Sequence, residues 1–146
     1  MERKITILSI DDEENIRFAL GELFHFQGWE ACSAPNVKKG LEQFRLHKPD
    51  IVLIDYHMPG INGVEGVQML RALSHTVPII VFTIDESQEV ADQFLQAGAS
   101  DFISKPFNKE ELIIRVTHQV SLVAAKRIIL NKTEELQRII AGRDKL

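Results

Sequence analysis

The chain has 146 residues, of which 45% are hydrophobic and 26% are charged, and this composition is typical of one globular domain with a short appendage. A single cysteine, Cys32, excludes an internal disulfide and fits a reducing compartment, which predicts a cytoplasmic protein. The longest apolar runs fall far short of the roughly 20 residues that cross a bilayer, so no membrane segment is expected.

Charge is distributed unevenly along the chain. Residues 1–118 carry 11 Lys and Arg against 18 Asp and Glu, whereas residues 119–146 carry 6 against 3. An acidic body repels phosphates, and six basic residues spread over a tail make no dense basic patch. We therefore expect no direct binding of nucleic acid.

Short apolar or β-rich segments alternate with segments of helical spacing. Strands are expected at residues 4–10, 30–34, 50–54, 78–83 and 100–104. Between them, apolar residues at helical spacing predict helices around residues 16–24, 37–44, 64–73 and 90–95. This alternation predicts an α/β fold with a doubly wound, five-stranded parallel sheet and helices on both faces.

The residues between these segments agree with their boundaries. Asn36 and Ser87 can cap the starts of helices, and Gly28 and Gly98 stand where helices should end.

The loop after the third strand contains three glycines, Gly60, Gly63 and Gly66. They lack the lysine and the spacing of phosphate-binding loops, so they predict a flexible strand-to-helix loop.

Polar residues follow four of the five expected strands. These residues are Asp11, Asp12, Asp55, Thr83 and Lys105. Each has a structural explanation of its own, such as an acidic helix start or a solvated lysine in a turn. Together, however, they would converge on one crevice at the carboxyl edge of the sheet, which is where parallel sheets bind ligands. Three crowded carboxylates need a bound cation or altered protonation, and oxygen ligands favour Mg²⁺.

Four segments carry a resemblance to the receiver domain of bacterial two-component response regulators. The matching segments are Ile-Leu-Ser-Ile-Asp-Asp-Glu (7–13), Asp-Ile-Val-Leu-Ile-Asp-Tyr-His-Met-Pro-Gly-Ile-Asn-Gly-Val-Glu (50–65), Pro-Ile-Ile-Val-Phe-Thr (78–83) and Gly-Ala-Ser-Asp-Phe-Ile-Ser-Lys-Pro-Phe (98–107). The resemblance covers about residues 4–120. It implies a flavodoxin-like sheet with strand order 2-1-3-4-5, a receiver domain at residues 1–120, and a signalling role in place of an enzyme activity.

The resemblance also assigns roles. It implies that Asp55 accepts a phosphoryl group from a sensor histidine kinase or a phosphotransfer protein. Asp12 would bind Mg²⁺ directly, Asp11 largely through water, and His57 through its backbone carbonyl.

The remaining site residues would stabilise the phosphoryl group and respond to it. The Lys105 ammonium and the Thr83 hydroxyl would contact its oxygens. The resemblance implies that Thr83 and Phe102 form the conformational switch, although ordinary packing explains Phe102 equally well. It also implies a cis peptide bond between Lys105 and Pro106.

Two residues depart from the family pattern. Ile84 is bulky where the family commonly has a small residue, so it is expected to alter access to the phosphoryl group. His57 lies two positions after Asp55 and either influences an attacking water or is an exposed bystander. Two alternative functions stay open: a receiver-like interaction module that acts without phosphorylation, and a phosphohydrolase with an aspartyl-phosphate intermediate.

No proline or glycine interrupts the chain from Asn108, a candidate helix cap, to about Gly142, which predicts one long helix from the domain into the tail. Residues 121–146 are therefore expected to form a helical extension or linker. The tail has an apolar stripe at alternating three- and four-residue steps, interrupted by Lys132: Leu122, Ala125, Ile129, Leu136 and Ile139. This stripe predicts a short coiled coil that makes a homodimer, with a helix folded back on its own domain as the alternative. Such a helix would also suit a linker to an output domain.

Overall fold

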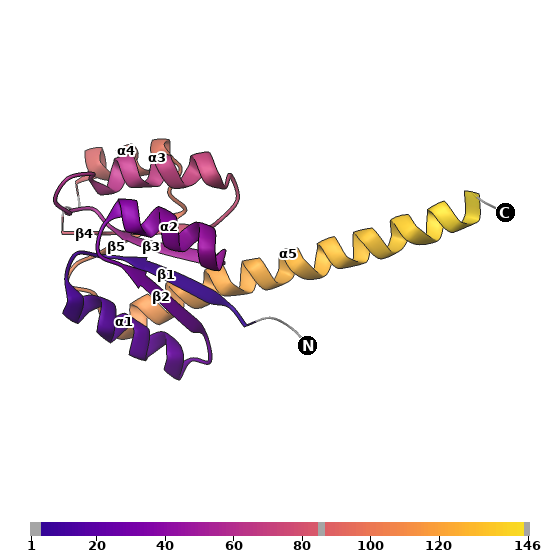
Figure 1. The fold of residues 1–146 in the computed structure, drawn as a ribbon, viewed down its shortest axis with the longest axis horizontal. Coiled ribbons are helices and arrows are strands. Elements are labelled where there is room, and N and C mark those ends of the chain that lie inside the picture. The colour runs from indigo at the N-terminus through magenta and orange to yellow at the C-terminus, as the bar shows by residue number, and fades with distance from the viewer. Residues whose placement is uncertain (1–3, 85–86, 145–146) are drawn as a thin grey trace.

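The computed structural model describes residues 4–84 and 87–144. Within them, five strands alternate with five helices (Figure 1). The strands are β1 (Thr6–Ile10), β2 (Glu30–Ala34), β3 (Ile51–Asp55), β4 (Ile79–Thr83) and β5 (Asp101–Ser104). The helices are α1 (Glu14–Phe26), α2 (Val37–His47), α3 (Gly63–Leu73), α4 (Gln88–Ala97) and α5 (Lys109–Asp144).

All strand pairs are parallel, and the sheet order is β2-β1-β3-β4-β5. The predicted fold class and strand order are therefore confirmed. The strands begin up to two residues later than the sequence pattern predicts. Because β3 and β4 lie inside the sheet with helices on both faces, all of their residues are buried.

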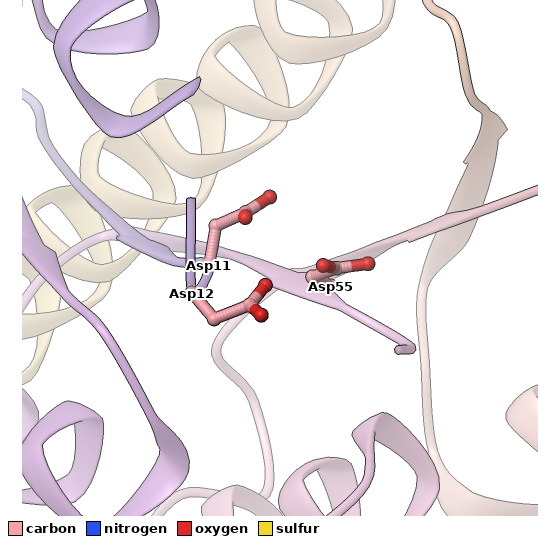
Figure 2. A group of neighbouring side chains, drawn as sticks. All are labelled: Asp11, Asp12 and Asp55. Atoms are coloured by element: carbon pink, nitrogen blue, oxygen red, sulfur yellow. The ribbon is translucent and has the colours of Figure 1, made fainter. Parts of the chain in front are cut away.

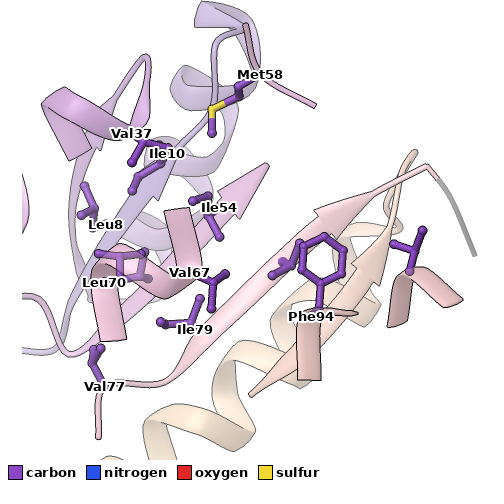
Figure 3. Close-up of a cluster of buried hydrophobic side chains, with 13 residues drawn as sticks. Leu8, Ile10, Val37, Ile54, Met58, Val67, Leu70, Val77, Ile79 and Phe94 are labelled. Carbon is purple, nitrogen blue, oxygen red and sulfur yellow. The ribbon is translucent and has the colours of Figure 1, made fainter. Parts of the chain in front are cut away.

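The sheet separates two hydrophobic clusters. On one face, Leu8, Ile54 and Val81 pack with residues of α2, α3 and α4, including Phe94 (Figure 3). On the other face, strand residues pack against α1 and the first part of α5; this cluster includes Ile7, Leu53, Phe82, Leu20, Phe24, Leu112 and Val116. Figure 1 shows the same division of helices between the two faces. The burial of β1, β3 and β4 specifies the register of these inner strands.

The predicted helix caps are present. The side chains of Asn36 and Ser87 accept hydrogen bonds from the backbone N–H of Lys39 and Val90. Gly28 and Gly98 have positive φ angles of 85° and 109°, in the conformation that follows helix ends.

The interpretation of the three glycines after β3 as a flexible loop is wrong for two of them. Gly63 and Gly66 lie in α3 and are buried, and only Gly60 is in the loop, with φ 84°. A Cβ atom on Gly63 would lie 2.7 Å from the Tyr56 Cα and 2.9 Å from the Asp55 carbonyl oxygen. These glycines allow close helix-to-sheet packing, which sequence spacing does not reveal.

Helix α5 continues without a break from the domain into the tail, as predicted, and residue 120 lies within it. Its last side-chain link to the body among the described residues is an ion pair between Arg127 and Asp50. From Ile128 onward the helix is exposed and projects away from the domain (Figure 1). The alternative of a tail folded back on its own domain is therefore wrong. No described helix is long and apolar enough to span a membrane.

Candidate functional site

Three carboxylates meet at the carboxyl edge of the sheet. Asp11 and Asp12 follow β1, and Asp55 is the last residue of β3, the strand paired with β1. Each offers an oxygen within 4.8 Å of the oxygens of the other two (Figure 2). Asp11 and Asp55 are buried, whereas Asp12 is exposed. The predicted convergence of these residues therefore occurs.

Lys105 crosses from the end of β5 to the carboxylates. Its Nζ lies 3.0 Å from Asp11 Oδ2 and 3.2 Å from Asp55 Oδ2. The Lys105 backbone N–H donates to the Thr83 carbonyl at 2.8 Å, which joins the ends of β4 and β5. The lysine is therefore held where its ammonium neutralises part of the buried negative charge.

The opposing carboxylate oxygens accept hydrogen bonds from nearby backbone. Asp11 Oδ1 accepts from the Glu13 N–H at 2.9 Å, and Asp55 Oδ1 accepts from the His57 N–H at 3.3 Å. Arg17 donates to the Asp11 carbonyl at 2.7 Å, which holds the β1–α1 turn. The two buried acids are thus fixed in orientation by backbone and by Lys105.

Burial and neighbouring charges act in opposite directions on the pKa values of Asp55 and Lys105. Burial raises the pKa of Asp55, and the charge of Asp11 raises it further, while Lys105 and the His57 N–H act in the lowering direction. Burial alone would lower the pKa of Lys105, but its hydrogen bonds and charge interactions with Asp11 and Asp55 outweigh burial, so the net pKa is raised. The site therefore holds a charged lysine and has excess negative charge.

The two candidate switch residues lie on neighbouring strands. Thr83 ends β4 and is 1% exposed. Phe102 lies on β5 opposite Val81 and is half-buried against the hydrophobic cluster on the α4 face. The Lys105–Pro106 bond is cis, as the resemblance implies.

The two departures from the family pattern both lie at the surface. The Ile84 side chain is 66% exposed. His57 is also exposed, with its ring 4.4 Å from the Tyr56 ring, centroid to centroid, in an edge-to-face arrangement. The exposed imidazole fits the bystander interpretation of His57, and its backbone N–H contributes to the site through Asp55.

The donor set fits a divalent cation that prefers oxygen. Three carboxylates from adjacent strand ends offer one oxygen each, and the exposed Asp12 leaves one side of the cluster open to solvent. Hard cations such as Mg²⁺ bind through a few carboxylates and keep several waters, and this half-open acidic cluster suits that mode of binding.

Sequence reasoning missed two residues that shape the site. Asn62 caps α3, because its side chain accepts from the Glu65 N–H at 3.0 Å. Gly63 then allows the helix to start against the Asp55 carbonyl. The Asn-Gly pair followed by Glu65 was the available signal, because Asn three residues before Glu is a typical helix start.

Comparisons with known proteins agree with this geometry. A family model for the response regulator receiver domain matches residues 7–117. The chain is 35% identical over 123 residues to regulatory protein AtoC of Escherichia coli, covering 84% of this chain and 27% of that protein. It is 32% identical over 139 residues to transcriptional regulatory protein RprY of Bacteroides fragilis, covering 95% of this chain and 58% of that protein. The chain thus spans less than two thirds of the length of these relatives.

Solved structures show the same fold. Chemotaxis protein CheY4 of Vibrio cholerae matches with a TM-score of 0.77 and 26% identity, over 80% of this chain and 98% of that one. A putative two-component response regulator with a GGDEF domain matches with a TM-score of 0.77 and 29% identity, over 83% of this chain and 51% of that one.

Proposed function

Because the chain belongs to the response regulator receiver domain family, we propose that it is a phosphorylation-controlled signalling module with Asp55 as the phosphoacceptor. The observation that carries this proposal is the contact of the Asp55 carboxylate with Lys105 in a buried acidic cluster. Among the three carboxylates, Asp55 alone belongs to the central strand β3, where it pairs in register with Phe82 of β4.

The proposed reaction moves a phosphoryl group between proteins. The N–P bond of a phosphohistidine on a sensor kinase or phosphotransfer protein breaks, and an O–P bond to the Asp55 carboxylate forms. The Lys105 ammonium, which now contacts the Asp55 carboxylate, then contacts the new phosphoryl oxygens as well. Asp11 keeps the lysine charged and positioned through its own 3.0 Å contact.

A bound Mg²⁺ would supply positive charge to the phosphoryl oxygens. Asp12, Asp11 and Asp55 would hold it, together with the backbone carbonyl of His57. The site needs this charge because Lys105 offsets only one of the three negative charges.

The proposed output is a conformational change at β4 and β5. A phosphoryl group on Asp55 attracts the Thr83 hydroxyl, because it adds strong acceptor oxygens at the same strand edge. In this proposal a shift of Thr83 lets Phe102, which is half-buried on the neighbouring strand β5, turn inward. Helix α5 follows β5 and would carry this change into the tail.

We further propose that residues 1–120 act as the receiver and residues 121–146 act as a signalling helix that pairs two chains or leads to an output domain. The exposed apolar stripe on the projecting helix supports pairing. The short span of this chain relative to its relatives supports an output domain in a longer protein. The phosphohydrolase alternative gains no support, because the exposed His57 stands where that mechanism places an acid.

The test is intact-mass measurement after incubation with acetyl phosphate and Mg²⁺. The chain should gain one phosphoryl mass, and Asp55→Asn should gain none. Asp92→Asn is the matched control, since Asp92 lies on the exposed face of α4 and should label normally. Equal labelling of Asp55→Asn and the unmodified chain would remove Asp55 as acceptor.

A second measurement tests the metal. Asp12→Ala should raise the Mg²⁺ concentration needed for labelling and weaken Mg²⁺ binding in calorimetry, because it removes the solvent-facing carboxylate. Unchanged binding would show that Asp12 is not a ligand. An unmodified chain that takes no phosphoryl group from acetyl phosphate or from histidine kinases would instead favour the interaction module that acts without phosphorylation.

A further inference from the structure

A groove of about 500 Å³ lies at the edge of the sheet opposite the carboxylate cluster. It is bounded by α5, by the α2–β3 loop that contains Asp50, and by the α3–β4 loop that contains Val77. Since Asp50 precedes β3 and Asp55 ends it, the length of the strand, about 16 Å, separates the groove from the candidate phosphoacceptor. We call this feature the basal groove.

The floor of the basal groove is apolar. Phe44 of α2, Val77 and Val123 of α5 line it, and all three are at least half-buried. Leu130, one helical turn beyond the last anchor of α5, also lines the groove yet is 61% exposed. Val123 and Leu130 are seven residues apart and so share one face of the helix. The apolar floor therefore continues onto the projecting part of α5.

The walls of the basal groove are fixed by arginines. Arg127 pairs with Asp50, and the second Asp50 oxygen accepts the Thr6 N–H of β1 at 2.9 Å. Across the groove, Arg71 donates to the carbonyls of Ser74 and Val77 and so holds the α3–β4 loop. Because these bonds hold both walls, the groove is preformed, and the protein loses little conformational entropy when a ligand binds.

The rim of the basal groove is cationic, although the chain as a whole has a net charge of −4. Lys48 and Lys126 line the groove and are exposed. No ion pair joins either ammonium to a described residue, whereas Arg127 is already paired with Asp50. A local surplus of positive charge beside an apolar floor is complementary to an apolar ligand that carries carboxylates.

We propose that the basal groove is a docking site for an acidic segment of a partner protein, in which apolar side chains alternate with Asp or Glu. The apolar side chains occupy the floor at Phe44 and Val123, and the carboxylates meet Lys48 and Lys126. Because Arg127 lies on the wall, the docked segment contacts the turn at which α5 leaves the domain. A partner bound here would therefore act on the tail from the edge opposite Asp55.

The test uses the full chain and two synthetic peptides, acetyl-Glu-Leu-Asp-Phe-Glu-Leu-amide and its charge-reversed counterpart acetyl-Lys-Leu-Lys-Phe-Lys-Leu-amide. In ¹H–¹⁵N spectra the acidic peptide should shift resonances of Val77, Val123 and Leu130, and the basic peptide should not. Lys126→Glu should weaken binding of the acidic peptide at least 5-fold. Lys38→Glu is the matched control, because Lys38 is exposed on α2 and does not line the groove.

Three results would overturn the proposal. Equal shifts with both peptides, or none with either, would show that the rim charge selects no acidic segment. Equal affinities of Lys126→Glu and Lys38→Glu would place binding elsewhere. If the Val77 resonance, which lies away from the apolar stripe of α5, shifts with protein concentration before peptide is added, the occupant is a second copy of the chain. If it shifts with decanoate but not with the acidic peptide, the occupant is a small amphiphile. None of these readouts requires phosphorylation, so they are independent of the role of Asp55.

Discussion

Gly63 leaves no room for a side chain beside the candidate phosphoacceptor. The atoms nearest to a Cβ at this position belong to the backbone of Asp55 and Tyr56, which cannot move without displacing the end of β3. Gly63→Ala should therefore destabilise the domain by about 1–3 kcal/mol, as overpacking does, and should slow phosphoryl uptake from acetyl phosphate.

Gly21→Ala provides the matched control for this prediction. Gly21 lies within α1, and a Cβ there meets no atom within 4 Å. Alanine should leave labelling unchanged and add up to about 1 kcal/mol of stability, because it is the better helix former. Urea unfolding and intact mass measure both effects. Equal stabilities of the two variants would show that the backbone at Asp55 yields easily.

Cys32 is predicted to be an inert thiol. Burial raises its pKa from 9.0 to about 11, and its Sγ lies 3.8 Å from the Ile7 carbonyl oxygen as a weak donor. At pH 8 the folded chain should hold about 100-fold less thiolate than the unfolded chain. Reaction with Ellman's reagent should be correspondingly slower in buffer than in about 8 M urea, which unfolds the chain.

The raised pKa of Cys32 makes the stability of the folded chain decrease at high pH. The neutral thiol is favoured in the folded state, so its contribution to stability is complete below pH 9 and declines as the pH rises towards 11. Labelling at equal rates in buffer and urea would contradict burial of this thiol.

At the scale of elements, the ion pair between Arg127 and Asp50 anchors α5 where it leaves the domain. Asp50 is 9% exposed and also accepts the Thr6 N–H. Loss of Arg127 therefore leaves a nearly buried negative charge without its arginine partner. Arg127→Ala should cost about 1–2 kcal/mol, at the low end for buried pairs because the arginine is partly exposed.

Hydrogen exchange should localise the effect of this anchor. In Arg127→Ala, amides of residues 120–130 should exchange faster, because the helix loses its last tie to the body. Arg138→Ala on the exposed part of α5 is the matched control and should leave those amides protected. Identical exchange in the two variants would mean that the apolar contacts of Val120 and Val123 alone hold the helix.

At the scale of the whole molecule, the projecting helix presents an apolar face that its own domain does not cover. At 100° per residue, Ile129 and Leu136 lie about 120–140° around the helix from Val123, which packs against the body. Both are more than half exposed, as is Ile140. A helix that packs against nothing is only marginally stable in water. We therefore expect the projecting part of α5 to be stabilised by pairing with a second chain.

Lysines placed in the apolar stripe of α5 should dissociate the paired chains. Light scattering should give a mass that increases with concentration for the unmodified chain and a monomer mass for Ile129→Lys combined with Leu136→Lys, because lysines would be buried in the seam. Asn131→Lys combined with Gln137→Lys adds the same charge away from the stripe and should still associate. A monomer at all concentrations for the unmodified chain would leave the helix as a linker or a surface for another protein.

Phosphorylation should alter this association only modestly. A modification shifts an equilibrium by no more than its differential effect on the two states, and Asp55 lies at the opposite edge of the sheet from the point where α5 leaves it. The same light-scattering series with acetyl phosphate and Mg²⁺ measures the shift.

The sequence by itself determined the order of strands and helices, the parallel sheet, and the set of polar residues at the strand ends. Alternating periodicity reports which faces are buried, and parallel strands bring their carboxyl ends to one edge, so Asp11, Asp55 and Lys105 had to lie near one another. The strand order and the roles of these residues came from the resemblance to receiver domains, because periodicity does not specify which strands are neighbours.

Only the tertiary structure decided features that depend on approach between distant segments. Gly63 resembled a loop residue until its packing against Asp55 was known, and Arg127 resembled any charge on a helical tail until its pairing with Asp50 was known. The basal groove combines residues of α2, α5 and two loops, so no local pattern marks it. The direction of the tail was likewise open, because an apolar stripe predicts a buried face without saying which surface buries it.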